Sequence, residues 1–265
     1  MIRMHRALGW QRDLPDHRDF LYSTPLAKLR ALPAKMDLRS VCPPVYDQGA
    51  LGSCTANAIA AAVQFDRRKA KQKPDFVPSR LFIYYNERLI EHTTHYDAGA
   101  QLRDGIKSVA KQGICAETAW PYDDTAPANE DAPFPKRAPA GKRPPAACYK
   151  EAAQHNAISY QRLQQTLTQM KGCLAEGYPF VFGFTVYEKW YEKGSAVLPL
   201  PAAHEGVVGG HAVLAVGYDD KKQQFTFRNS WGAKAGDKGY FYMPYAYLTD
   251  ANLASDLWTI RRMEG

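Results

Sequence analysis

The chain has 265 residues, of which 45% are apolar and 23% charged, and it carries a formal net charge of +7. This composition is typical of a globular protein with one large core or two lobes, and it excludes a mainly disordered, collagen-like or coiled-coil chain. The longest apolar runs, at residues 180–186 and 211–216, have the length of strands and are too short to span a membrane.

The N-terminus and the basic segments set expectations about compartment and partners. No apolar core follows the charged residues 1–6, so we expect no secretory signal peptide: the protein stays in the cell, or its signal has been removed. Residues 134–150 hold five basic and no acidic side chains, and residues 1–31 hold six against three. A basic footprint can bind nucleic acid. Because no nucleic-acid motif accompanies it, we expect a solvated surface.

The first half of the chain indicates helices. Residues 1–31 form an arm whose periodicity is interrupted by Pro15 and Pro25. An alanine-rich helix is predicted from Ser53, and Ser79 can cap a second helix that runs to Ile90. Leu102, Ile106, Val109 and Ala110 recur at helical spacing, and Gly113 ends this third helix.

The second half indicates strands. Six prolines between residues 127 and 145 predict an exposed loop, and a helix over residues 163–174 ends at Gly177. Runs of β-branched and aromatic residues follow at 180–186, 211–218, 223–229, 239–243 and 257–261. Helices first and strands afterwards favour an α+β fold with two lobes.

Two motifs carry reactive side chains. In the first, Gly49 and Gly52 punctuate a loop that delivers Cys54 to a helix N-terminus, where the helix dipole favours a thiolate. In the second, His211 opens an apolar strand, and a short hairpin after it would return Asn229 to its side. Each motif alone also fits a structural residue. Together they can form a nucleophile, a base and a group that orients the base.

These motifs resemble those of the papain-like cysteine peptidases, in the version found in a bacterial branch of the family. The resemblance rests on Gln48, on Gly52-Ser53-Cys54, on Gly210-His211-Ala212 and on Asn229-Ser230-Trp231-Gly232. Residues 32–39 resemble the mature N-terminus of the family, and residues 239–241 resemble a late strand.

The resemblance implies a fold and a domain organisation. We expect a papain-like α+β fold with a helical first lobe, an antiparallel β-barrel-like second lobe and the active-site cleft between them. Residues 1–31 would be a short propeptide-like arm and residues 32–265 the peptidase domain. Its helical lobe would span about 48–125, its proline-rich loop 127–145 and its β-rich lobe about 155–265.

The resemblance also implies site residues and partners. Cys54 would attack as a thiolate paired with His211, Asn229 would fix the His211 tautomer, and Gln48 would donate to the oxyanion. The family's substrate-binding positions correspond to Gly99, Ala100, Leu102, Gly183, Gly210 and Ala212. Small residues among them suggest a roomy apolar pocket. We expect a monomer that acts on peptide or protein substrates, without a cofactor or metal and without a nucleic-acid or membrane partner.

The sequence departs from the family pattern near the site. Leu51 and Asp97 stand where a disulfide is usual, Thr55 replaces a tryptophan after the nucleophile, and Ala235 replaces another near Asn229. Shielding of the His–Asn hydrogen bond would then rest on Trp231. These changes remove no catalytic atom, but they alter the walls of the site.

Several alternatives remain open from the sequence. The same thioester could serve an acyltransferase, or the scaffold could be a catalytically silent binding module. The arm could inhibit as a plug over Cys54 or only stabilise the fold as a strap, and we expect it to pack through Phe20, Leu21 and Tyr22. Cys42, Cys115, Cys148 and Cys173 could pair in three ways, and we expect at most one bridge.

Overall fold

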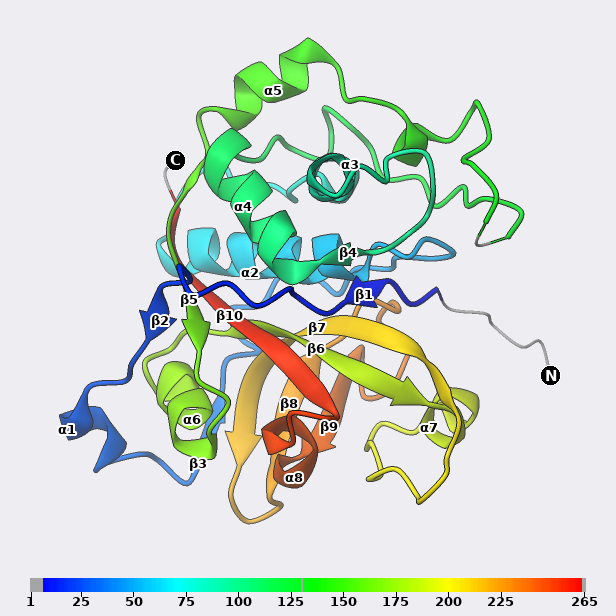
Figure 1. Cartoon of the computed structure of the whole chain (residues 1–265). Coiled ribbons are helices and arrows are strands. Elements are labelled where there is room, and N and C mark those ends of the chain that lie inside the picture. Colours follow the sequence, from blue (N-terminus) through cyan, green and yellow to red (C-terminus); the bar gives the residue numbers. More distant parts are fainter. Residues whose placement is uncertain (1–6, 130, 264–265) are drawn as a thin grey trace.

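A computed structural model describes residues 7–129 and 131–263 of the chain. Helices α3, α4 and α5 lie on one side of the long central helix α2, and a curved sheet lies on the other side (Figure 1). The N-terminal segment runs between these two parts. The predicted α+β fold, with helices before strands, is confirmed.

The helical part is built around α2 (Cys54–Lys69), which is buried from Cys54 to Arg67. Its many alanines let neighbouring elements approach closely from several sides. As predicted, Ser79 caps α3 (Arg80–Ile90) by accepting a hydrogen bond from the N–H of Phe82. A strand, β4 (Ala100–Gln101), leads directly into α4 (Leu102–Gln112), and Gly113 ends that helix with a φ of 79°.

The sheet has the strand order β2-β5-β10-β6-β7-β8-β9, with β3 also paired to β7. This path is open, with β2 and β9 at its ends. All pairs are antiparallel except β2 with β5. The strands are β2 (Leu21–Tyr22), β3 (Lys35–Asp37), β5 (Ala157–Leu163), β6 (Phe180–Tyr187), β7 (Val207–Asp219), β8 (Gln224–Arg228), β9 (Tyr240–Pro244) and β10 (Ala254–Met263).

Shorter helices connect these elements. They are α1 (Leu26–Leu29), a 3-10 helix (Pro139–Gly141), α5 (Ala146–Ala152), α6 (Leu167–Ala175), α7 (Glu188–Lys193) and α8 (Tyr245–Thr249). Among the described residues, no helix combines the length and the apolar character that crossing a membrane requires.

Two element predictions need correction. Leu163 belongs to β5, so the helix predicted over residues 163–174 begins at Leu167, where Thr166 caps it. The proline-rich loop is not exposed throughout, because Ala140 is fully buried and its carbonyl accepts a hydrogen bond of 2.5 Å from the Arg88 guanidinium. Arg88 is itself buried, so it needs such an acceptor.

The arm is ordered from residue 7, and its strand β1 (Trp10–Gln11) pairs in parallel with β4 (Figure 1). The expectation that the arm packs on the body through Phe20, Leu21 and Tyr22 is wrong for two of these side chains. Phe20 is 71% and Leu21 58% exposed, while Tyr22 is buried. Successive side chains of a strand point to opposite faces, so β2 turns only Tyr22 inward.

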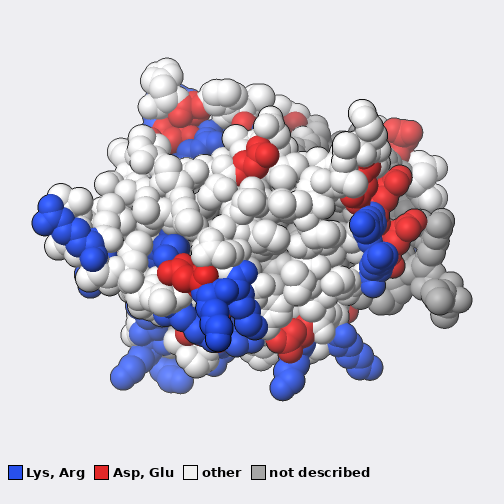
Figure 2. Space-filling model, turned by 90° about the horizontal axis from the view of Figure 1, so that it is seen from below, with Lys and Arg blue, Asp and Glu red and all other residues white. Residues whose placement is uncertain are grey.

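Figure 2 shows the face of the molecule seen from below, on the side of the sheet. Lys and Arg side chains stand there in separate groups, several of them beside Asp or Glu. In the part of this face that the structure describes, the basic groups do not merge into the continuous stripe that tracks a nucleic-acid backbone.

Candidate active site

Cys54 is the first residue of α2 and is fully buried. The backbone N–H groups of Ala212, Gly9 and Thr55 donate hydrogen bonds to its sulfur. The bond from Ala212 places the sulfur beside β7 (Val207–Asp219), at the residue that follows His211. The predicted nucleophile and base therefore lie on adjoining elements, one from each lobe.

His211 and Asn229 form the predicted pair. The His211 Nε2 lies 2.8 Å from the Asn229 Oδ1, and both side chains are buried. The same Oδ1 accepts the N–H of Ser230 at 2.8 Å. Because this oxygen can only accept, Nε2 carries the proton and Nδ1 is the basic nitrogen. The antiparallel pairing of β7 with β8 brings the two residues together, as the hairpin predicted.

Aromatic rings enclose His211. Trp231 stacks on the imidazole with centroids 4.8 Å apart, and Phe184 approaches it edge-on at 5.7 Å. Trp190, from α7, stacks on Trp231 at 5.4 Å. The sequence indicates shielding by Trp231 but not by Trp190. A single tryptophan in a short charged helix has no periodicity that shows which way it faces.

Gln48 is fully buried and held from both ends of its amide. Its Oε1 accepts a hydrogen bond of 2.6 Å from the Ser230 hydroxyl. Its Nε2 donates to the carbonyl oxygens of Leu51 at 2.9 Å and of Ala7 at 3.0 Å. The amide donor therefore already binds a carbonyl of the arm.

The arm covers Cys54. Burial raises the pKa of the Cys54 thiol to about 12, although the N–H groups of Ala212 and Gly9 act in the opposite direction. The thiol is therefore neutral while the arm is docked. The sequence had suggested a depressed thiol pKa, and in this covered form the shift has the opposite sign because water is excluded.

Four of the six predicted substrate-binding residues touch the arm. The Ala100 N–H donates to the Gly9 carbonyl at 2.8 Å, and a Cβ on Gly99 would overlap the same group. A Cβ on Gly183 would overlap the Trp10 ring, and one on Gly210 would overlap the Trp10 carbonyl. Trp10 is only 7% exposed, so it fills a pocket that glycines make possible.

The two remaining predicted residues lie in the core that Trp10 joins. Leu102 and Ala212 are fully buried, and both belong to the same hydrophobic cluster as Trp10. Ala212 faces Gly183 across the β6–β7 pair. The indole ring of Trp10 thus lies against Gly183, one of the small residues that suggested a roomy apolar pocket.

The departures from the family pattern have local partners. The Asp97 carboxylate accepts the N–H of Gly52 at 3.0 Å and also binds the Tyr84 hydroxyl, so a hydrogen bond holds this loop where a disulfide is usual. The Thr55 hydroxyl donates to Glu87 at 2.7 Å. Burial raises the pKa of Glu87 well above its ordinary value, which favours the protonated form of this carboxyl.

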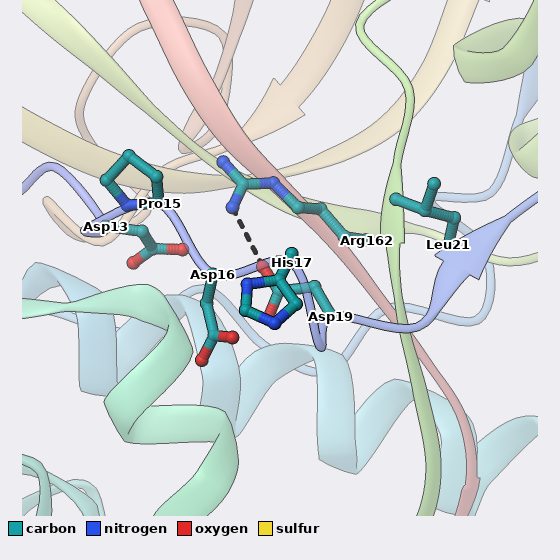
Figure 3. A pocket seen from close by; sticks show the side chains of 7 residues that line it. All are labelled: Asp13, Pro15, Asp16, His17, Asp19, Leu21 and Arg162. Carbon is teal, nitrogen blue, oxygen red and sulfur yellow. Dashed lines mark hydrogen bonds and ion pairs between the residues drawn. The ribbon is translucent and has the colours of Figure 1, made fainter.

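Charged side chains anchor the arm to both lobes. Asp19 pairs with Arg103 of α4 at 2.6 Å and with Arg162 of β5 at 3.0 Å. Asp13 accepts the Arg103 N–H at 3.0 Å and the Trp258 indole N–H at 2.8 Å. Figure 3 shows the hollow beside this anchor, which is lined by the arm and by Arg162.

All five cysteines are buried thiols. Cys115 and Cys148 pack in one small cluster with Phe82 and Ala152. The expectation of at most one bridge stays a prediction for oxidised protein, in which Cys115 and Cys148 share a cluster.

Comparisons with known proteins agree with this geometry. The sequence model of the papain family of cysteine proteases matches residues 32–258. A peptidase C1-like protein of Acanthamoeba polyphaga mimivirus is 38% identical over 285 residues, which cover 97% of this chain and 88% of the relative.

Solved structures extend the comparison. Xylellain, a cysteine protease from Xylella fastidiosa, is 49% identical and superposes with a TM-score of 0.93 over 98% of this chain and 97% of its own. The procathepsin B of Trypanosoma congolense, at 17% identity, shares the fold with a TM-score of 0.75 over 98% of this chain and 87% of its own. The resemblance to a bacterial branch is thus confirmed, and the chain belongs to the papain family of cysteine proteases.

Proposed function

We propose that this papain-family cysteine peptidase hydrolyses peptide bonds through Cys54 and His211, and that its own arm keeps it latent. The observation that carries the proposal is the contact of Gly9 with the Cys54 sulfur, made within a buried Cys–His–Asn arrangement. The cleft thus holds Cys54, His211 and Asn229, and the arm segment around Gly9 lies over the Cys54 sulfur.

Once the arm leaves, water reaches the thiol. The penalty of burial then falls, and a proton passes from the Cys54 sulfur to His211 Nδ1, which gives a thiolate and an imidazolium. The thiolate attacks the substrate carbonyl, and the imidazolium protonates the leaving amine. Asn229 holds the ring through Nε2 during both steps. Water, deprotonated by His211, then hydrolyses the thioester.

The tetrahedral intermediate needs donors for its oxyanion. We assign this role to the Gln48 Nε2 and the Cys54 backbone N–H. In support, the Gln48 Nε2 already donates to a peptide carbonyl, that of Ala7, at 3.0 Å. Ser230 fixes the amide with its oxygen turned away from this carbonyl.

The arm is suited to inhibit rather than to be cleaved. The group that it presents to the sulfur is the N–H of Gly9, which a nucleophile cannot attack. It also uses the donors that a substrate would need, at Gln48 and Ala100. Of the two roles considered for the arm, these contacts favour the plug over the strap.

The test uses a full-length chain in which residues 26–31 carry the recognition sequence of an unrelated protease. Residues 26–28, 30 and 31 are exposed, so the folded chain can be cut there. After cutting, we expect peptides to be cleaved into products with free carboxylates, as mass spectrometry would detect. Products joined to an added amine instead of water would indicate an acyltransferase, and binding without any product would indicate a silent module.

A matched pair of thiol variants identifies the nucleophile. Cys54→Ser should abolish product formation, whereas Cys42→Ser, which changes another buried thiol, should leave it unchanged. Equal loss in both variants would contradict the assignment of Cys54.

A further inference from the structure

The loop between Gln48 and Cys54 is held near both ends by one hydroxyl group, that of Tyr122. This tyrosine lies between α4 and the 3-10 helix, 74 residues from Gln48 in the sequence. Its hydroxyl donates to the backbone carbonyl of Gln48 at 2.8 Å and lies 2.7 Å from the Ser53 Oγ. Both contacts adjoin a proposed oxyanion donor, because Gln48 supplies its side-chain amide and the residue after Ser53 is Cys54.

The hydrogen bonds behind Tyr122 all run in one direction. The Gln48 carbonyl can only accept, so the one hydroxyl proton of Tyr122 points to it, and Ser53 donates to the tyrosine oxygen. The Ser53 Oγ accepts from the Asn57 Nδ2 at 3.1 Å. The Asn57 Oδ1 accepts from the Arg80 guanidinium at 3.2 Å. Four hydrogen bonds thus lead from a positive charge to the Gln48 carbonyl, and bonds in such a chain strengthen one another.

Burial protects this chain from competition by water. Asn57 and Ser53 are fully buried, and Arg80 is 8% exposed. The Arg80 guanidinium lies 3.7 Å from the centroid of the Tyr122 ring and pairs with Glu117 at 2.7 Å. Burial also raises the pKa of Tyr122, so its hydroxyl keeps its proton and stays a donor.

We propose that Tyr122 is a positioning residue for the oxyanion hole, because it fixes the Gln48 end of the loop relative to Cys54. The Gln48 N–H donates to the Ser230 carbonyl at 2.9 Å, which ties Gln48 to the sheet lobe, and Tyr122 adds the tie to the helical lobe. Oxyanion donors act through fixed geometry, and a misplacement of about 1 Å can cost roughly 10²-fold in rate. The inference rests on the proposed peptidase function, since it concerns the same reaction.

The first test removes only the hydroxyl. In the full-length chain, cut in α1 as above, Tyr122→Phe should lower kcat on a peptide by roughly tenfold and leave KM within about twofold. The change falls on kcat because the oxyanion exists only after attack on the carbonyl. Tyr149→Phe is the matched control. Its hydroxyl bonds to Asn86 at 3.0 Å in the same lobe, so its loss should leave kcat unchanged.

A double-mutant cycle separates positioning from general support of the fold. In a chain that carries Gln48→Ala, Tyr122→Phe should cost less than about threefold, because the donor that Tyr122 positions is already gone. A tenfold loss in both backgrounds would overturn the proposal. So would an unchanged kcat in Tyr122→Phe alone.

A second variant keeps the proposal testable if Tyr122→Phe does not fold. Among the described contacts of Ser53, its hydroxyl bonds to Tyr122 and Asn57 instead of capping α2, so Ser53→Ala leaves the helix start intact. It keeps the bond from Tyr122 to Gln48 but removes the donor behind it. We expect a smaller loss of kcat, which should also vanish in the Gln48→Ala background. An additive loss there would overturn the proposal.

Hydrogen exchange provides a readout that does not need turnover. In the same cut chain, the backbone N–H groups of residues 46–56 should exchange faster in Tyr122→Phe than in Tyr149→Phe. Equal exchange in both variants would overturn the positioning role. Full cleavage of the peptide by Tyr122→Phe would overturn this inference alone. The absence of any cleavage by the starting chain would overturn the proposed function, and the exchange comparison would still decide whether Tyr122 holds the loop.

Discussion

Burial decides the charge of the sulfur at the centre of the site. Cys54 lies at a helix start and receives three backbone N–H groups, an arrangement that favours a thiolate, yet its complete burial raises its pKa to about 12. The same residue can therefore be inert or nucleophilic, depending on what lies over it. His211 and Asn229 are already aligned at 2.8 Å, so the activation that we propose needs no rearrangement of this pair.

The pair of catalytic side chains should act as a unit. In the cut chain, we expect Cys54→Ala to abolish peptide turnover and His211→Ala to be nearly as severe. The double variant should be little worse than either single one, because each change alone removes the thiolate–imidazolium pair. Initial rates on one peptide, with circular dichroism to check folding, would measure this. A double variant far slower than both singles would contradict the assignment.

Gln48 should matter for turnover more than for binding. Loss of one oxyanion donor usually lowers kcat roughly 10²–10³-fold, and we expect Gln48→Ala to do so with a smaller change in KM. Since Gln48 also bonds to Ser230 and Leu51, the melting temperature must be measured beside the kinetics. A lower melting temperature with unchanged kcat would show that Gln48 only supports the loop.

The site residues that belong to a motif could be predicted from the sequence. Residues whose role depends on a contact with a distant part of the chain could not. Cys54, His211 and Asn229 stand out because their types and neighbours are unusual together. Trp190 and Asp97 have no such signature. Trp190 reaches the imidazole through Trp231 and Phe184, and Asp97 reaches the Gly52 N–H from 45 residues away in sequence.

At the scale of elements, the arm connects the two lobes. Asp19 bonds to Arg103 in α4 and to Arg162 in β5, while Trp10 lies on the β6–β7 surface. The Asp19 side chain is 8% and that of Arg103 4% exposed, so this ion pair is shielded from water and salt, whereas Arg162 is 25% exposed. The charged residues between positions 13 and 19, rather than Phe20 and Leu21, therefore hold the arm.

Breaking this anchor should activate the uncut chain. Removing one partner of a buried ion pair is strongly destabilising, so we expect Asp19→Asn to raise kcat/KM on a peptide by roughly 10–100-fold. Arg18→Gln is the control, because Arg18 bonds to Asp16 within the arm itself. It should leave the activity near that of the starting chain. An equal rise in both variants would indicate a general loosening of the arm instead of a specific anchor.

Acidity should strengthen docking through Asp13. Burial, helped by the nearby Asp256 carboxylate, raises the pKa of Asp13 to about 6 against an ordinary value of 3.8. Below about pH 4, Asp13 is protonated in both the docked and the free arm, so its ionisation does not affect docking. Between about pH 4 and 6, Asp13 ionises in the free arm but stays largely protonated in the docked arm. Docking therefore weakens as the pH rises through this range, and above it the effect levels off.

The comparison with Asp13→Asn isolates this effect, because the amide resembles the protonated acid. The measured quantity is the ratio of Cys54 alkylation rates, starting chain over variant, in which the pH dependence of the thiol cancels. We expect the ratio to rise across pH 4–6, by at most on the order of 10²-fold, and to be flat above. A flat ratio throughout, or one that falls with pH, would contradict this role of Asp13.

Long elements were easier to predict than short ones. The apolar patterns of α2, α3, α4 and the β6–β9 strands identify them, because periodicity accumulates over many residues. The strands β1, β2 and β4 each have two residues, so they have no period to detect. Their positions are set by partners far away in the sequence, and the path of the arm through the cleft follows from those pairings.

At the scale of the whole molecule, the two lobes and the arm form one enclosed site. The helical lobe contributes Cys54 and Ala100, the sheet contributes His211 and Gly183, and the arm lies between them (Figure 1). The central claim is that removal of this arm uncovers Cys54 of a papain-family peptidase.

The rate at which a peptidyl epoxide alkylates Cys54 tests this claim most directly. It is measured by peptide mapping of the full-length chain with the cleavable α1 segment, before and after the cut. We predict slow labelling before the cut and, after it, labelling at least tenfold faster that is confined to Cys54, with Cys42, Cys115, Cys148 and Cys173 unmodified. Equal rates before and after the cut, or labelling spread over all five cysteines, would contradict the account.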